Sequence, residues 1–360
     1  MDLKHYSTRT WIISNPEIFF RILRGFSRAL LLRKNTLRTL HILPTFICQA
    51  RCTMCSVAKF QRRTESLLTL EDYESVAHQA ARMGAVAVTF LGGEPLLAEN
   101  LDEIIRIFKS HSFFASVVSN GIAMTRPLAR RLRTAGLDAI HFGLECLDEE
   151  VNDGLRGYRG QCQKVMRAIE VCQEEGLRVG LCTVLFPGHP ERYRELAEFS
   201  RRKGLAMALP SLAEVGAAEE SGCASEDDYR LVTGLLKKYP HLTVDWGFSY
   251  YLRPRCPSGK EKIAITCHGD VLGCTLNHIS FGNVKRESLK TLWERAGRFS
   301  QFRKNSRRCL AAFDRFHIDN YLAPLGRFPE SPVYFADHPN ITPETEPGLY
   351  RDAPKGRGVR

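Results

Sequence analysis

The sequence contains no run of about 18 or more uncharged apolar residues, the length that a helix needs to cross a bilayer. Its first residues, MDLKHYSTRT, also lack the short apolar core and small-residue cleavage site of a signal peptide. We therefore predict a cytoplasmic protein without a membrane span. No nucleic-acid-binding motif accompanies the basic residues, so no nucleic-acid partner is expected.

The chain has twelve cysteines and no export signal, which argues against a disulfide framework. In a reducing compartment, clustered thiols more often bind metal or do redox chemistry. The net charge of +11 favours an acidic partner, an anionic substrate or a membrane surface, unless it is simply a solvated basic surface. With 44% hydrophobic residues, 360 residues suffice for one large globular domain or two smaller ones.

Residues 40–210 repeat one pattern, in which a short β-branched or apolar run precedes a longer segment of helical period. The predicted strands are 40–45, 85–91, 114–119, 139–144, 178–186 and 205–209. The predicted helices are 70–83, 101–109, 127–135, 163–175 and 190–203. This alternation implies a parallel sheet, but the pattern alone does not separate a barrel from an open doubly wound sheet.

An amphipathic helix is predicted before this core, from Asn15-Pro16-Glu17 to about Arg33. One face carries Phe19, Ile22, Phe26 and Leu30, and another carries Arg21, Arg24 and Arg28. Such a basic helix can make a peripheral membrane contact, although we expect this stripe to pack on its own domain. At the other end, seven of the seventeen prolines lie beyond Ala323, which predicts an irregular, surface-bound tail.

The stretch FICQARCTMC places Cys48, Cys52 and Cys55 in a C-x3-C-x2-C pattern directly after the first predicted strand. Structural zinc sites take four protein ligands, and a four-iron cluster has four metal corners. Three cysteines leave one position open, for water or substrate on zinc, or for a small molecule on the unique iron. Structural zinc also usually shows paired C-x2-C knuckles, and this stretch has one.

This motif resembles the signature of the radical S-adenosylmethionine (SAM) superfamily. The resemblance implies a partial (β/α)6 TIM-like barrel in which Cys48, Cys52 and Cys55 hold a [4Fe–4S] cluster. The open iron would chelate SAM, and one electron would cleave SAM to methionine and a 5′-deoxyadenosyl radical that removes a hydrogen atom from the substrate. It also implies an acidic electron donor such as flavodoxin or ferredoxin.

Three further stretches support the resemblance, namely LGGEPL, SNG and GLRG, each placed after a predicted strand. By resemblance, Gly92, Gly93 and Glu94 would meet the methionyl amino group, and Ser119 and Asn120 would lie near SAM. Arg156 would pair with the SAM carboxylate through its bidentate guanidinium.

Two positions depart from the family pattern. Many relatives carry an aromatic residue before the third cysteine, where this chain has Met54, a position used near adenine. Many relatives also read S-L-D-G after the fourth strand, where this chain reads Gly143-Leu144-Glu145-Cys146. Glu145 replaces the aspartate, and the serine contact is lost.

A second group of cysteines follows the core. Cys256-x12-Gly269-x4-Cys274, with Gly282-Asn283 and Trp293, resembles the SPASM and twitch extensions, which bind auxiliary iron–sulfur clusters. The expected ligands of one auxiliary [4Fe–4S] cluster are Cys256, Cys267, Cys274 and Cys309. A zinc site with the same thiolates is the alternative. Without Cys267, which lies inside a predicted hairpin, one iron would be open to substrate.

The expected organisation has five parts: a basic helical segment (1–39), the core barrel (40–210), a linker and helix (211–255), the auxiliary-cluster region (256–310) and the irregular tail (311–360). The expected activity is hydrogen abstraction from a peptide or natural product. A small-molecule or lipid-modifying dehydrogenase or epimerase is the alternative, and a non-catalytic zinc-binding scaffold is the alternative from another class. No catalytic residue is assigned, although Cys146 or Cys182 could return a hydrogen atom to an epimerised substrate.

Overall fold

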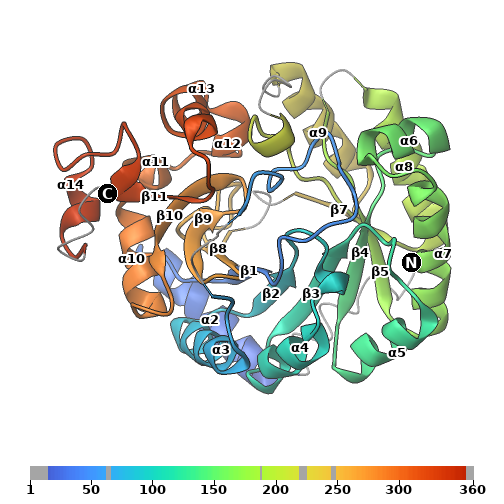
Figure 1. Cartoon of the computed structure of the whole chain (residues 1–360), viewed down its shortest axis with the longest axis horizontal. Helices are drawn as coiled ribbons and strands as arrows, with labels where there is room; N and C mark the ends of the chain where they lie inside the picture. Colours follow the sequence, from blue (N-terminus) through green and yellow to red (C-terminus); the bar gives the residue numbers. More distant parts are fainter. Residues whose placement is uncertain (1–14, 62–65, 187–188, 219–224, 245–248, 354–360) are drawn as a thin grey trace.

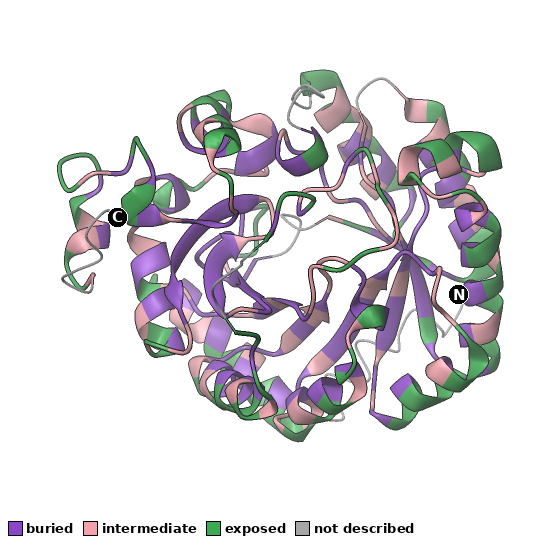
Figure 2. Cartoon of the chain, in the orientation of Figure 1, coloured by how far each residue is buried: buried purple, intermediate pink, exposed green. Residues whose placement is uncertain are grey.

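The computed structural model describes residues 15–61, 66–186, 189–218, 225–244 and 249–353. One sheet runs through this part of the chain in the order β11-β10-β9-β8-β1-β2-β3-β4-β5-β6-β7. Figure 1 shows that the middle of the sheet curves and that helices cover its outer side. Figure 2 shows that the strands are buried, whereas the outer helices turn exposed faces to solvent.

The curved core contains every strand and helix that the sequence predicts between residues 40 and 210, with ends that differ by a few residues. Its strands are β1 (Thr39–Leu43), β2 (Ala87–Phe90), β3 (Phe114–Ser119), β4 (Ala139–Gly143), β5 (Arg178–Cys182) and β6 (Ala206–Ala208), extended by β7 (Leu242–Thr243). Its outer helices are α3 (Leu70–Met83), α4 (Leu101–Ser110), α5 (Arg126–Thr134), α7 (Gln161–Glu174) and α8 (Pro190–Lys203). All neighbouring strands from β1 to β7 pair in parallel and in chain order, so the sheet is a partial barrel and not doubly wound.

Local sequence explains where these helices begin and which face they bury. Thr69 and Asp72 form a capping box at the start of α3, as the sequence predicts. Tyr73, Val76 and Ala80 then follow at helical spacing and are buried against the sheet. The helix ends at Gly84, which has a φ of 104°.

One helix of the core, α6 (Glu149–Arg156), is not predicted by the sequence. Gly154 lowers its intrinsic helix propensity, and its only fully buried side chain is polar, so no apolar period marks it. Asp148 caps its start by accepting a hydrogen bond from Val151 N, and Gly157 ends it in the left-handed conformation. This helix carries the GLRG motif.

The C-terminal half continues the same sheet. β8 (Lys262–Thr266) pairs in parallel with β1, and β9 (Asp270–Cys274) and β10 (Asn277–Asn283) follow as antiparallel strands. β11 (Val333–Tyr334) then joins β10 in parallel. The remaining helices are α9 (Glu226–Lys238), α10 (Leu289–Arg298), α11 (Ser300–Arg303), α12 (Leu310–Phe313), α13 (Arg315–His317) and α14 (Pro347–Tyr350), with short turns η2 (Pro95–Leu97), η3 (Gly216–Ala218), η4 (Ile318–Leu322), η5 (Ala323–Arg327) and η6 (Phe335–Asp337).

The prediction of a surface-bound tail is wrong for the described residues. Phe335, Ile341 and Leu349 are buried in a second hydrophobic cluster. Fully buried Arg295 of α10 donates to the carbonyl oxygen of Asp352 at 2.8 Å. Prolines fix the backbone locally but do not decide burial, so an irregular segment with spaced apolar residues can still complete a core.

The predicted packing of the N-terminal helix is also wrong in part. The helix is α2 (Pro16–Leu30), and it packs on the barrel mainly through Ile18, Arg21, Gly25 and Ala29, the residues of its buried face. Phe19 and Leu30, expected to pack inward, are exposed, whereas Ile22 and Phe26 are half-buried. Within the described residues, no helix is long and apolar enough to cross a membrane.

Candidate active site

The three cysteines of the C-x3-C-x2-C motif lie on one loop after β1, at the carboxyl edge of the parallel strands. Thr53 N donates to the carbonyl oxygen of Leu155 in α6 at 2.9 Å, and Ala217 N donates to that of Cys55 at 2.9 Å. The loop is therefore fixed on both sides by backbone hydrogen bonds. Cys48 is exposed, and Cys52 and Cys55 are half-buried.

The thiols are close enough to affect each other. Burial, together with the neighbouring Cys52 and Cys48, raises the pKa of Cys55 to about 11. Burial also raises the pKa values of Cys48 and Cys52. Three thiolates on one short loop therefore need positive charge beside them, as a bound metal centre supplies.

The GGE motif packs directly beneath this loop. Gly93 N donates to Thr45 O at 3.0 Å, and Glu94 N donates to Ile47 O at 2.7 Å. A Cβ on Gly93 would lie 2.3 Å from Ile47 O, so the second glycine is required by contact with the cysteine loop itself.

Glu94 joins the second and third strand ends. Its carboxylate accepts hydrogen bonds from Leu96 N at 3.0 Å, Ser119 Oγ at 2.8 Å and Asn120 N at 2.7 Å. Burial raises the pKa of this carboxyl group, and the three donors oppose the rise. Glu94 therefore positions the SNG turn in addition to any contact with a ligand.

Asn120 connects the SNG turn to the cysteine loop. Its Nδ2 lies 3.6 Å from Cys48 Sγ and donates to Gln49 Oε1 at 3.3 Å. Its Oδ1 accepts a hydrogen bond from Ile122 N at 2.9 Å, which fixes the orientation of the amide. The amide thus presents its NH2 group to the first thiol.

Arg156 reaches the site from the end of α6 and forms a buried ion pair with Glu145. Its guanidinium also hydrogen-bonds to the Cys52 thiol. A Cβ on Gly143 would lie 2.3 Å from Arg156 Nη2, so glycine in place of the family's serine makes room for this guanidinium. Arg156 Nε is buried and has no hydrogen-bond partner among the described residues.

Two polar residues of this site were not predicted, Asn152 and Gln161, and both are fully buried. Asn152 Oδ1 accepts from Glu145 N at 2.9 Å, and its Nδ2 donates to Gln161 Oε1 at 2.6 Å. Gln161 Nε2 donates to the carbonyl oxygens of Asn120 and Gly143, at 2.8 and 2.9 Å. The network ties the ends of β3 and β4 together, and no periodicity in the sequence marks it.

Beside the loop, a cavity of about 370 Å³ opens inside the barrel. His41, Thr89, Ser116 and His141 line it from β1 to β4, and burial lowers the pKa of His141 to about 4, so the imidazole is neutral. The sequence could have indicated these four positions, because they are polar residues inside predicted strands. The cavity is also lined by Met54.

The two candidate hydrogen donors are placed differently. Cys182, at the end of β5, lines the barrel cavity. Cys146 is buried, and its Sγ lies 3.4 Å from the carbonyl oxygen of Asp148. Of the two, only Cys182 is among the residues that line this cavity in the described part of the chain.

The auxiliary cysteines divide into two groups. Cys274 is next to Cys256, whose thiol adds to the burial that raises the pKa of Cys274 to about 11. Cys256 N donates to Ser306 O at 2.9 Å, and Cys309 packs against the hydrophobic cluster that contains Cys256. The structure therefore places Cys274 beside Cys256, and the hydrogen bond to Ser306 brings the segment just before Cys309 to Cys256.

Cys267 is not brought to them, and the expectation that it joins them is wrong. It lies at the turn of the β8–β9 hairpin, whereas Cys274 ends β9 opposite the start of β8. A strand rises about 3.3 Å per residue, so about 15 Å separates them along the hairpin. Cys267 is buried and accepts a hydrogen bond from Leu68 N through its carbonyl oxygen.

The other motif residues of this region explain that turn. Asn283 Nδ2 donates to His268 O at 2.9 Å, and Gly269, with a φ of 93°, has no room for a Cβ beside Asn283 Oδ1. Trp293 Nε1 donates to Lys260 O at 3.0 Å. Glycine, asparagine and tryptophan of the motif thus hold the hairpin in place.

Two family models match the chain. The radical SAM superfamily matches residues 42–200, and an iron–sulfur cluster-binding domain, SPASM, matches residues 256–312. The chain belongs to the radical SAM superfamily. The protein is therefore a radical SAM enzyme with a SPASM region, and its cofactors are a [4Fe–4S] cluster, SAM and auxiliary iron–sulfur.

Curated relatives include the PqqA peptide cyclases of Xanthomonas euvesicatoria and Rhizobium meliloti. Each is 25% identical to this radical SAM enzyme, over 281 and 294 residues, and each alignment covers 72% of this chain and 74% of the relative. Among solved structures, SuiB of Streptococcus suis bound to S-adenosylmethionine has a TM-score of 0.62 at 18% identity, covering 75% of this chain and 68% of SuiB. The structure of anSMEcpe with bound AdoMet has a TM-score of 0.55 at 16% identity, and the match covers 71% of this chain and 80% of anSMEcpe.

The donor set around the cysteine loop fits a cluster that binds SAM. Three thiols share one loop, Asn120 lies beside Cys48, and Arg156 lies beside Cys52 with a buried, unpartnered Nε. Within the described residues, no three His, Cys, Asp or Glu side chains are arranged around one metal ion. This agrees with a cluster site, because the thiolates of a four-iron cube bind separate iron atoms and need not surround one point.

Replacing Gly93 by alanine will displace the cysteine loop, because the new Cβ meets backbone and not a flexible side chain. We expect a loss of about 1–3 kcal/mol in the free energy of unfolding, the usual cost of overpacking, and a lower iron content at the loop. Gly154→Ala is the matched control, since its Cβ has no atom within 4 Å and alanine favours the exposed helix. Urea unfolding of both variants measures the difference; equal stabilities would contradict it.

Proposed function

We propose that this radical SAM enzyme modifies a peptide and that Cys48, Cys52 and Cys55 hold the cluster that binds SAM. The observation that carries the proposal is the single loop with three thiols at the carboxyl edge of the strands, beside the barrel cavity. When bound there, the cluster and SAM supply a radical that removes a hydrogen atom from the substrate. Similarity to PqqA peptide cyclases, and to SuiB, which has been solved bound to its precursor peptide SuiA, supports a peptide substrate.

The residues of the site would then have distinct roles. Gly92 and Gly93 bring backbone close to the SAM amino group, and Glu94 holds the SNG turn with Ser119 and Asn120 against it. Arg156 neutralises Glu145 and presents its remaining donor, Nε, to the SAM carboxylate.

Met54 would pack near adenine, because it is buried beside the cavity with Leu212 and Ala218. The apolar wall that these residues form excludes water from the reacting atoms. Asn152 and Gln161 are positioning residues, since they hydrogen-bond to the backbone of the site without facing a ligand.

The auxiliary cluster would be held by Cys256, Cys274 and Cys309. Contact between Cys256 and Cys274, and the hydrogen bond from Cys256 N to Ser306 O near Cys309, support this set. Three protein thiolates would leave one iron of a cube without a cysteine ligand. That open position could anchor the substrate, as the sequence already suggested for a site without Cys267.

The expected electron donor is a small acidic protein such as flavodoxin or ferredoxin, because the enzyme carries a net charge of +11. A cytoplasmic location is part of the same proposal, since no disulfide joins the described cysteines.

One experiment tests the substrate class. The reconstituted enzyme is given SAM, reductant and short peptides encoded beside its gene, synthesised with deuterated side chains. We expect deuterium in the 5′-deoxyadenosine and a mass change in one peptide. Formation of 5′-deoxyadenosine without deuterium transfer from any of these peptides would reject the peptide assignment.

The same assay tests the auxiliary ligands. Cys256→Ser/Cys274→Ser should lower the iron content from about eight to about four per chain, abolish peptide modification and leave SAM cleavage without substrate largely intact. Cys267→Ser is the matched control, because that thiol lies at the other end of the hairpin, and its iron content should equal that of the wild type. If Cys267→Ser lost four irons per chain, Cys267 would be a ligand of the auxiliary cluster after all.

A further inference from the structure

The N-terminal helix α2 turns large apolar side chains toward solvent near both of its ends. Phe20, Leu23 and Leu31 are 64%, 50% and 79% exposed, and Leu32 continues the row. The inner face carries Ile18 and two small residues together with Arg21, which donates to the carbonyl oxygens of residues 85 and 111, at 3.2 and 3.0 Å. The ridge formed by Phe19, Phe20, Leu23, Leu30, Leu31 and Leu32 is therefore exposed by the way the helix is anchored.

A basic pocket of about 600 Å³ lies at the C-terminal end of this ridge. Five of its lining residues are basic: Arg33, Arg253, Arg255, Lys260 and Arg303. No acidic side chain lines it among the described residues. Burial and the nearby charge of Arg255 lower the pKa of Lys260 to about 8. A bound anion would raise this pKa and so favour the charged ammonium group.

Arg255 is buried in the wall of this pocket, and its side chain is held in place by its neighbours. It is 6% exposed, its guanidinium stacks on the Tyr251 ring at 4.3 Å, and its Nη1 lies 3.8 Å from Glu261 Oε1. Its Nε and Nη1 have no hydrogen-bond partner within the described part of the chain. A buried guanidinium with unused donors is suited to an anionic oxygen.

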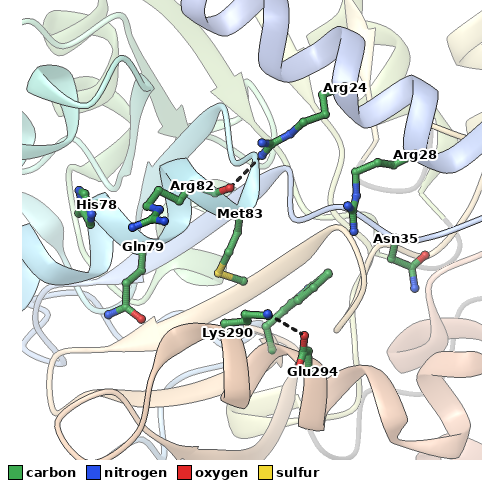
Figure 3. Close-up of a pocket in the computed structure, with 10 residues that line it drawn as sticks. Arg24, Arg28, Asn35, His78, Gln79, Arg82, Met83, Lys290 and Glu294 are labelled. Carbon is green, nitrogen blue, oxygen red and sulfur yellow. Dashed lines mark hydrogen bonds and ion pairs between the residues drawn. The ribbon is translucent and has the colours of Figure 1, made fainter. Parts of the chain in front are cut away.

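The opposite flank of α2 is basic as well. Figure 3 shows a second pocket, of about 490 Å³, into which Arg24 and Arg28 of α2, Arg82 of α3 and Lys290 of α10 extend. Arg24 donates to the carbonyl oxygen of Arg82 at 2.9 Å. The one acidic lining residue, Glu294, pairs with Lys290 at 3.9 Å, so the arginines keep their charge toward an outside partner.

The backbone is bent to place this surface. Arg33 and Leu252 have φ values of 53° and 55°, a region that residues other than glycine rarely adopt. Arg33 lines the basic pocket, and Leu252, between the lining residues Tyr251 and Arg253, is 69% exposed. Such conformations persist where the surrounding structure holds them, and here they bring a cation and an exposed leucine beside the same pocket.

We propose that this surface binds an anionic lipid bilayer, with the ridge of α2 inserted at the interface and a phosphate-bearing headgroup in the basic pocket. An apolar ridge flanked on both sides by arginines is the arrangement of helices that lie in the membrane plane. An acidic protein would match the arginines but would leave no reason for the six large apolar side chains that are exposed toward the two ends of the helix.

The proposed surface lies away from the cysteine loop. Arg21 contacts residues that precede β2 and β3, so α2 covers the amino edge of the barrel, whereas the cysteine loop follows the carboxyl end of β1. Membrane binding would therefore leave the cavity accessible, and the proposal does not depend on the substrate being a peptide.

Vesicle sedimentation tests the proposal. The full-length reconstituted enzyme should bind phosphatidylcholine vesicles that contain phosphatidylglycerol and should not bind phosphatidylcholine alone. Arg33→Ala/Arg253→Ala should weaken binding about 20-fold or more, since each basic residue near an anionic surface contributes about fivefold. Leu23→Ser/Leu31→Ser should also weaken vesicle binding, because the ridge would insert fewer apolar side chains into the bilayer. This variant leaves the residues of the basic pocket unchanged. Arg202→Ala/Lys203→Ala, exposed on α8, removes the same charge elsewhere and should bind as the wild type does.

The outcomes separate the possible sources of phosphate. Equal binding to both vesicle types, or unchanged binding by both test variants, would overturn the proposal. So would calorimetric binding of inorganic phosphate that needs Arg33 and Arg253 in an enzyme that does not sediment with vesicles, because the pocket would then serve a soluble anion. SAM cleavage measured in the same samples reports on the active site separately.

Discussion

Replacing Cys48, Cys52 and Cys55 together by alanine will abolish 5′-deoxyadenosine formation. The three thiols are the donors on the loop after β1, and burial together with their mutual repulsion raises the pKa of Cys55 to about 11. They are therefore poor thiolates by themselves, and as the proposed ligands they would lose their protons when iron compensates their charge. Without these proposed ligands there would be no cluster to supply an electron to SAM.

Chromatography of anaerobic reactions with dithionite and SAM measures this loss. Cys172→Ala is the matched control, because Cys172 is a buried thiol in α7 outside the site, and its product yield should match that of the wild type after correction for folded protein. Iron content should fall by about four per chain in the triple variant and stay constant in the control. Undiminished 5′-deoxyadenosine in the triple variant would reject the assignment of these cysteines.

Arg156→Ala will cost stability as well as SAM affinity. Glu145 is almost completely buried, and Arg156 is its ionic partner. Removing one member of a buried ion pair leaves the other charge uncompensated, at a cost of about 3–5 kcal/mol in the free energy of unfolding. Loss of a charged hydrogen bond to the SAM carboxylate should weaken SAM binding by about 1.5–3 kcal/mol.

Urea unfolding of the cluster-free protein and calorimetry of the reconstituted enzyme separate the two effects. Glu145→Ala/Arg156→Ala should be more stable than Arg156→Ala, because no buried charge remains. Gly143→Ala should be tolerated better when Arg156 is alanine, since its Cβ then no longer meets Nη2. If Arg156→Ala unfolds like the wild type, the pair is not structural; if SAM affinity is unchanged, the carboxylate is bound elsewhere.

The sequence alone determined the elements of the barrel and the location of its chemistry. The β-branched runs and the helical periods predicted β1 to β6 and five outer helices, because the spacing of apolar residues directly reflects strand and helix geometry. C-x3-C-x2-C after the first strand placed Cys48, Cys52 and Cys55 at the carboxyl edge, where the structure has them. Glu94, Asn120 and Arg156 likewise lie beside that loop, although their contacts with SAM stay predictions.

The tertiary structure alone decided how separate segments meet. The sequence predicted that Cys267 binds the same cluster as Cys256 and Cys274. The pairing of β8 with β9 instead puts Cys267 at the opposite end of the hairpin from Cys274. An amphipathic pattern gives a helix two faces without saying which one meets the protein, and in α2 buried Arg21 faces the barrel while Leu23 faces solvent. The pairing of Arg156 with Glu145, and the space that Gly143 leaves for it, depend on contacts between residues far apart along the chain, which no local period records.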